Sequence, residues 1–259
     1  MVMNPERVAY AGLLGSPSVR EMGTLTIYAS LGNPLSISRE DGKWESVDFA
    51  VVPPYVRHRV ATNDRIIGVL MVEPETVALD EVSRLLQGDQ EGAGNMSARI
   101  RDTFSKLVGG KLVQTEVSSL DIDGAFFGRP LPSREIDSRI AKVVNRIRSN
   151  PGDQLSAQDC AALTGLSFSR FLHLFRDEVG TTYRRFRAWK RARSLLAYVN
   201  GEPNLTDVAL EIGYPDSTHF SHSIRHVYGL KPRDIFAGSR SLAVVLQAER
   251  GPSPALRLA

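Results

Sequence analysis

The first half of the chain alternates apolar and polar residues over short runs, which is the pattern of half-buried β-strands. Clusters of Gly, Pro, Asn and Asp separate these runs and mark turns. The predicted strands are residues 24–30, 35–38, 49–52 and 66–72. Several short strands at this spacing predict a small β-barrel or jelly roll.

Apolar residues then recur every three or four positions, as on one face of an α-helix. Two such stretches, residues 75–86 and 97–108, follow the predicted strands. Their apolar faces have two open roles, packing on the barrel or pairing with a second copy of the chain. The pattern breaks up between residues 109 and 133 and ends in GRPLPS, whose prolines suit a linker.

One helix–turn–helix pattern occurs twice in the second half of the chain. In the first copy, Ala161 stands four positions before Gly165, and Ser167 precedes an apolar pair at Phe171 and Phe175. Ala lets two helices approach closely, Gly supplies a turn with positive φ, and Ser caps the next helix. The second copy repeats this order with Ala209, Gly213, Asp216, Phe220 and Ile224.

Charge is divided unevenly along the chain. Residues 1–133 carry 13 Lys and Arg against 17 Asp and Glu, whereas residues 134–240 carry 17 against 11. The basic excess therefore coincides with the repeated motif, as attraction to DNA phosphates requires. Helices are predicted at residues 134–149 and 183–199, and the second of these joins the two copies.

The repeated motif resembles the DNA-binding module of the AraC/XylS transcription regulators, which holds two helix–turn–helix units joined by a long helix. The resemblance covers roughly residues 139–234 and is densest in LTGLSFSRFLHLFRDEVGTTYRRF and LTDVALEIGYPDSTHFSHSIRHVYGLKPRDI. The second run keeps the Gly213–Tyr214 turn of the family and its closing Gly229 and Pro232. Two such matches in tandem are far more specific than one.

The resemblance and the strand pattern together imply an α+β fold. The segment VDFAVVPPYVRHRV is similar to the cupin-like sensor domains that these regulators often carry. We expect a cupin- or jelly-roll-like β-barrel with following helices, serving as a sensor and dimerisation domain, at residues 1–110. A linker at 111–133, an all-α tandem helix–turn–helix domain at 134–240 and a loosely ordered tail at 241–259 follow.

By this resemblance, the outward positions of the second helix in each unit read base edges. These residues are Ser169, Leu172, His173, Ser217, Thr218 and His222. Phosphate contacts, which position the protein without reading sequence, fall to Arg170, Arg176, Arg225 and Lys231. Along the joining helix we expect a largely outward basic face made of Arg184, Arg185, Arg187, Lys190, Arg191 and Arg193.

Two histidines depart from the family pattern. His173 and His222 stand where the family often has Arg. A guanidinium grips guanine with two parallel hydrogen bonds, and a neutral imidazole cannot. The base preferences of relatives therefore do not carry over to this chain.

The mouth of the predicted barrel is a candidate site for a small molecule. Its candidate rim residues are Tyr28, Trp44, Arg57, His58 and Arg59. A packing or solvated role is the alternative for each of them.

No metal, cofactor or catalytic residue is expected. A cupin metal centre needs several His and a carboxylate, and the first half of the chain contains only His58. His219, His222 and His226 have helical spacing, but no Cys or carboxylate cluster stands beside them. The single cysteine, Cys160, lies on a predicted helix, where a small buried side chain is the simplest role.

These features predict a non-enzymatic transcription regulator that binds double-stranded promoter DNA. Further candidate partners are RNA polymerase, a small-molecule effector and a second copy of the chain. A cytoplasmic location is expected because the sequence shows no export signal and no apolar run of the ~20 residues that a membrane span needs. The alternative is a cupin-like small-molecule-binding protein or enzyme whose helical half serves assembly.

Overall fold

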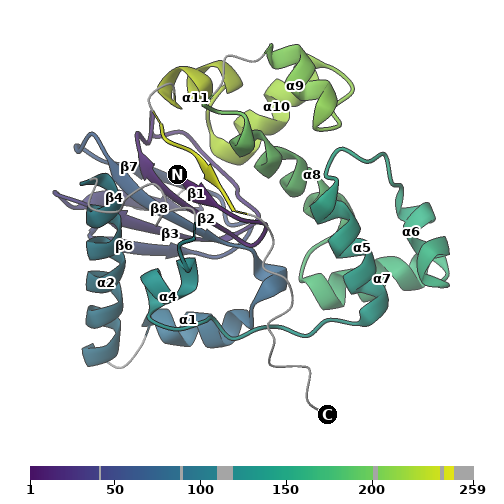
Figure 1. The fold of residues 1–259 in the computed structure, drawn as a ribbon, viewed down its shortest axis with the longest axis horizontal. Coiled ribbons are helices and arrows are strands. Elements are labelled where there is room, and N and C mark those ends of the chain that lie inside the picture. The colour runs from purple at the N-terminus through teal and green to yellow at the C-terminus, as the bar shows by residue number, and fades with distance from the viewer. Residues whose placement is uncertain (41, 88–89, 110–118, 201–203, 240–241, 248–259) are drawn as a thin grey trace.

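The computed structural model describes residues 1–259 except 41, 88–89, 110–118, 201–203, 240–241 and 248–259. A β-rich N-terminal domain lies beside a helical C-terminal domain, whose helices form two groups at the two ends of α8 (Figure 1). Within the described residues, no helix combines the length and apolar character needed to cross a membrane.

Two sheets form the N-terminal domain, one with strand order β6-β3-β8-β2-β1-β9 and one with order β5-β4-β7. The strands are β1 Val2–Met3, β2 Arg7–Gly12, β3 Leu25–Ser30, β4 Leu35–Arg39, β5 Glu45–Val47, β6 Phe49–Val52, β7 His58–Ala61, β8 Ile67–Val72 and β9 Val245–Leu246. Neighbouring strands are antiparallel except for β1 and β9, which are parallel. The expected α+β fold is confirmed, with two sheets instead of a closed barrel across the described residues.

Both faces of the larger sheet are covered, so β3 and β8 are buried along their whole length. One face packs on helices, through residues such as Leu25 and Ile27. These helices are α1 Leu79–Gln87, α2 Gln90–Val108 and α4 Ile122–Phe127, and the short helix η1 Pro74–Thr76 precedes α1. The other face meets the smaller sheet and the C-terminal domain.

The helices after the strands pack on their own sheet. Val82 on α1 and Ile100 and Phe104 on α2 are fully buried in this core. The two apolar faces therefore take the packing role, and the dimerisation role considered for them has no support here. The segment expected to be a linker, residues 111–133, contains α4, and residues 111–118 of that segment lie outside the described residues.

The C-terminal domain contains two helix–turn–helix units on either side of a connecting helix. Its helices are α5 Ser138–Ser149, α6 Ala157–Thr164, α7 Phe168–Val179, α8 Tyr183–Ser194, η2 Leu195–Ala197, α9 Leu205–Glu211, α10 Ser217–Tyr228 and α11 Pro232–Ser239. The first unit, α6–α7, has its own core with α5 and α8 around Phe171 and Phe175. The second unit, α9–α10, shares a core with the N-terminal sheets, in which Phe220 and Ile224 belong to the same cluster as Tyr28.

Residues 242–247 of the expected tail lie along the N-terminal domain, and its other residues lie outside the described ones. Strand β9 pairs with β1 at the edge of the large sheet. The N-terminal ammonium of Met1 donates to the carbonyl of Ala243 at 2.6 Å. The tail therefore returns to the N-terminal domain because the edge strand β1 offers it unpaired backbone groups.

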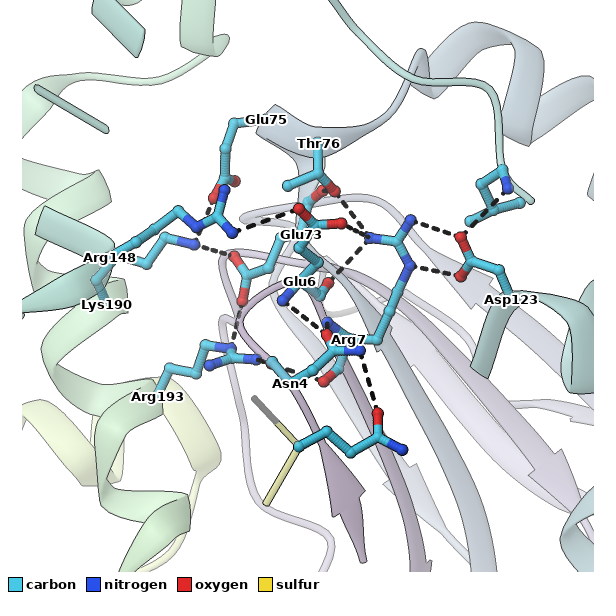
Figure 2. A network of polar contacts seen from close by, with 12 residues as sticks. Asn4, Glu6, Arg7, Glu73, Glu75, Thr76, Asp123, Arg148, Lys190 and Arg193 are labelled. Carbon is cyan, nitrogen blue, oxygen red and sulfur yellow. Dashed lines mark hydrogen bonds and ion pairs between the residues drawn. The ribbon is translucent and has the colours of Figure 1, made fainter. Parts of the chain in front are cut away.

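A buried cluster of charges joins the two domains (Figure 2). Lys190 on α8 donates to Glu73 and Glu75 at 2.5 Å each, and Arg193 Nε lies 2.6 Å from Glu73. The indole nitrogen of Trp189 donates to the same Glu73 carboxylate at 2.9 Å. The side chains of Glu73, Glu75 and Lys190 are at most 3% exposed, so each charge depends on its partners for stabilisation.

Glu73 is the centre of this cluster. Burial alone would raise its pKa, but Lys190 and Arg193 hold the pKa of the carboxyl below its ordinary value. Because the pKa is lower in the folded state, the cluster stabilises the fold above the ordinary carboxyl pKa. That stabilisation is lost as the pH falls through the folded-state value.

We expect Glu73→Gln to lower the free energy of unfolding by about 3 kcal/mol at pH 7, because the buried Arg193 loses its carboxylate partner and Lys190 keeps only that of Glu75. Urea denaturation measures the loss, and the difference from wild type should shrink as the pH falls through the lowered pKa of Glu73. The matched control is Glu45→Gln, which removes an exposed pair with Arg39 and should cost at most about 1 kcal/mol. Equal losses for the two variants would contradict this role for Glu73.

Candidate DNA-binding surface

The first helix–turn–helix unit is defined by its caps. Helix α6 starts with a capping box between Ser156 and Asp159 and ends at Gly165, whose φ is +65°. Ser167 then caps α7 by accepting a hydrogen bond from the backbone N–H of Arg170. The Gly turn and the Ser cap predicted from the sequence are both confirmed.

The second unit repeats this geometry more tightly. Gly213 has a φ of +89°, and a Cβ at this position would lie 2.6 Å from the carbonyl oxygen of Gly152. Asp216 caps α10 by accepting hydrogen bonds from the backbone N–H groups of Thr218 and His219, at 2.8 and 2.9 Å. The hydrogen bonds from His219 lower the pKa of the Asp216 carboxyl, so the cap is charged at neutral pH.

The recognition helices α7 and α10, the second helices of the two units, present their predicted DNA-binding residues to solvent. Nine of the ten are exposed: Ser169, Arg170, His173, Arg176, Ser217, Thr218, His222, Arg225 and Lys231. Leu172 is only partly exposed and packs against the core of the first unit. It therefore contributes to packing as well as to any surface. Lys231 lies on neither recognition helix but between α10 and α11.

The expected basic face of the connecting helix is only partly present. Arg184 and Arg185 are exposed. The guanidinium of Arg187 donates to the backbone carbonyls of Leu155 and Asp153, so it braces the loop before α6. The outward placement was wrong for Lys190 and Arg193, which are buried against the N-terminal domain.

Of the five predicted ligand residues, the structure brings together Tyr28 and His58. The Tyr28 hydroxyl lies 2.7 Å from His58 Nε2, and His58 Nδ1 lies 2.8 Å from the Val56 carbonyl. Burial lowers the pKa of His58 to about 4, so the ring is neutral at pH 7. Since a carbonyl only accepts, Nδ1 carries the proton and Nε2 accepts from Tyr28. The other three are exposed or half-buried: Trp44, Arg57 and Arg59.

A cavity of about 190 Å³ lies between the two domains, and Tyr28 is the one predicted ligand residue that lines it. Arg20 also lines it, together with apolar side chains of both domains. Sequence analysis missed Arg20, because it lies in an irregular segment before β3 that carries no periodicity or motif.

The structure offers no metal centre within its described residues, where no three potential metal-binding side chains cluster. His219 pairs with Asp216 at 2.7 Å, and His226 lies 3.6 Å from Glu21. Cys160 is fully buried beside Tyr183, and burial raises the pKa of its thiol, so it packs as a small side chain.

Comparison with known proteins supports this geometry. Residues 160–238 match a family described as a helix-turn-helix domain. A 72-residue segment is 35% identical to the invasion protein InvF of Salmonella typhi, covering 27% of this chain and 33% of that protein. The HTH-type transcriptional activator RhaS of Klebsiella pneumoniae is 25% identical over 181 residues, which is 61% of this chain and 63% of RhaS. These matches support the resemblance of the C-terminal domain to the AraC/XylS transcription regulators.

The matched regions span a third of InvF and under two thirds of RhaS. Over nearly the whole chain, the fold of this protein is similar to that of ToxT from Vibrio cholerae O395. The TM-score is 0.57 with 10% identity, covering 90% of this chain and 96% of ToxT. A structure of ToxT with an unsaturated fatty acid bound gives a TM-score of 0.54 at 10% identity, covering 92% and 97% of the two chains.

The two turn glycines give a matched test of the local geometry. We expect Gly213→Ala to destabilise the protein by about 2 kcal/mol or more, because it adds a clash with backbone to a left-handed conformation. Gly165→Ala should cost only about 1 kcal/mol, because its φ is similar and its added Cβ meets nothing within 4 Å. Thermal or urea unfolding measures both. A larger loss for Gly165→Ala would show that the second turn is not the tighter one.

Proposed function

We propose that this protein is an AraC/XylS-family, sequence-specific DNA-binding transcription regulator that enters two successive major grooves with α7 and α10. The observation that carries the proposal is the pair of capped helices with exposed, donor-rich faces at the two ends of α8 (Figure 1). We call α7 and α10, each with its helix–turn–helix unit, the first and second reader. On B-DNA, two readers on one face lie about 34 Å apart, one helical turn.

Within each reader the roles follow from side-chain chemistry. Ser169, His173 and Ser217, with Thr218 and His222, offer short or planar polar groups that suit base edges. Arg170, Arg176, Arg225 and Lys231 suit phosphates, which draw the protein to DNA and fix its register. Leu172 has only part of its surface left for a thymine methyl group.

An effector is part of the proposal. ToxT, which shares this fold, has been crystallised with an unsaturated fatty acid and with (E)-4-(8-methylnaphthalen-1-yl)but-3-enoic acid. The cavity between the two domains of this chain is a place where a small molecule would contact the sheets and the second reader at once. RNA polymerase and a second copy of the chain are proposed partners, and the cytoplasm is the proposed location.

The alternative of a cupin-like enzyme has less support. His58 is the one histidine of the N-terminal domain, and both its ring nitrogens are engaged by Tyr28 and Val56. A helical half that serves only assembly also does not account for the exposed basic and polar faces of α7 and α10.

Binding to duplex DNA across a salt series tests the proposal. The affinity should fall steeply as salt rises, and Arg170→Ala or Arg225→Ala should weaken binding to all sequences and reduce the salt slope by about one each. His222→Ala should instead relax the preference at one base position, with a loss of roughly 1–3 kcal/mol at the preferred site. Fluorescence anisotropy on labelled duplexes measures these effects.

Arg84→Ala is the matched control. Arg84 is an exposed arginine on α1 of the N-terminal domain, so its loss should leave affinity and salt slope unchanged. If Arg84→Ala and Arg225→Ala weaken binding equally, attraction is diffuse and the recognition helices are not the readers.

A further inference from the structure

We infer that the cavity between the two domains binds a small monocarboxylate with an apolar tail, held by Arg20, and that occupancy is transmitted to recognition helix α10. The inference rests on the proposed function, because it names the chemistry and the place of the effector.

The cavity has the size and walls for a small apolar body. Tyr10, Val69 and Met71 line it from the N-terminal domain, and Leu196 and Ile235 line it from the C-terminal domain. Its volume of about 190 Å³ exceeds the ~150 Å³ engineered cavity that accepts benzene. One ring or a medium-length alkyl chain therefore fits.

Arg20 supplies a charged end to this apolar space. Arg20 is only 6% exposed, yet its Nε and Nη2 atoms have no hydrogen-bond partner among the described residues. These two nitrogens form one edge of the guanidinium, and such an edge binds a carboxylate through two parallel N–H···O bonds. A buried cation that lacks these bonds is costly, and an anionic ligand would supply them.

The surroundings of Arg20 favour an external anion. The Tyr28 hydroxyl donates a hydrogen bond to His58, so its oxygen can accept a hydrogen bond from Arg20. Burial raises the pKa of Tyr28, and the nearby positive charge of Arg20 acts in the opposite direction. Asp234 is the acidic residue of the lining, and it is exposed to solvent. Glu21, the next residue, is engaged by Arg185 at 2.5 Å.

The segment that carries Arg20 also holds the end of α10. Ser18 donates to the carbonyl of Gly229, the C-cap residue that follows α10, at 2.5 Å. The backbone N–H of Glu21 donates to the Val227 carbonyl at 3.1 Å, and the Glu21 carboxylate lies 3.6 Å from His226. A ligand that repositions Arg20 therefore acts on the recognition helix through residues one or two positions away.

Calorimetric titration of the full chain with octanoate, 1-octanol and acetate tests the site. Octanoate should bind at least about tenfold more tightly than 1-octanol, which has the same chain without the charge, and acetate should not bind measurably. In Arg20→Gln the ratio of the octanoate and octanol affinities should fall to about one. Arg57→Gln, which removes an exposed arginine outside the cavity, should leave the ratio unchanged.

A second variant keeps the test valid if Arg20→Gln does not fold. Gly238 lines the cavity and a Cβ there meets nothing within 4 Å, so Gly238→Leu adds bulk at a position that has room for the first side-chain atom. It should weaken both octanoate and octanol. If wild-type protein binds octanoate no better than octanol, or binds neither, the site is refuted.

Transmission is measured as the change in DNA affinity on adding saturating octanoate. We expect a change of at least about fivefold, and DNA must change the octanoate affinity by the same factor. Glu21→Gln should bring that factor towards one while octanoate binding without DNA is retained, and Glu45→Gln should have no effect. Octanoate binding without any DNA binding would leave the site standing and refute the proposed function; binding of both without coupling would refute the transmission.

Discussion

The buried charge cluster between Glu73, Glu75 and Lys190 decides how this molecule is arranged. Lys190 and Arg193 lie on the helix that joins the two readers, so pairing them with the N-terminal domain fixes that helix against the sheets. Trp189 donates to the same carboxylate and extends the contact into the apolar core. The positions of both recognition helices therefore follow from one set of interdomain contacts, because each is packed against α8 or its neighbours.

The two readers depend on the N-terminal domain to different degrees. The first unit closes its own core around Phe171 and Phe175, whereas Phe220 of the second unit belongs to the core that includes the sheets. Segment 18–21 adds hydrogen bonds to the end of α10. A change in the N-terminal domain therefore acts first on the second reader and on its angle to the first.

Local features were predictable from the sequence, and features that depend on distant partners were not. The caps at Ser167 and Asp216 and the turns at Gly165 and Gly213 involve neighbours in the chain, and each was found as predicted. Strands β3, β4, β6 and β8 were predicted within a residue or two, but β1, β2, β5, β7 and β9 were not among the predicted strands. The burial of Lys190 and the pairing of β9 with β1 require knowledge of which segment packs opposite, and Arg20 lies in no regular pattern at all. An amphipathic helix shows that one face is buried, without showing that a basic face meets a second domain.

The spacing between the two readers is the central claim, and selection of bound sequences from pooled random duplex DNA tests it most directly. Full-length protein should enrich a motif of two half-elements whose centres lie about 10 base pairs, one helical turn, apart. The whole motif should occupy one face of the duplex. Replacing the outward residues of α7 should remove the base preference of one half-element only, and replacing those of α10 should remove that of the other. Enrichment of a single half-element, or of halves at variable spacing, would contradict the account, because α8 would then not hold the two readers at a fixed separation.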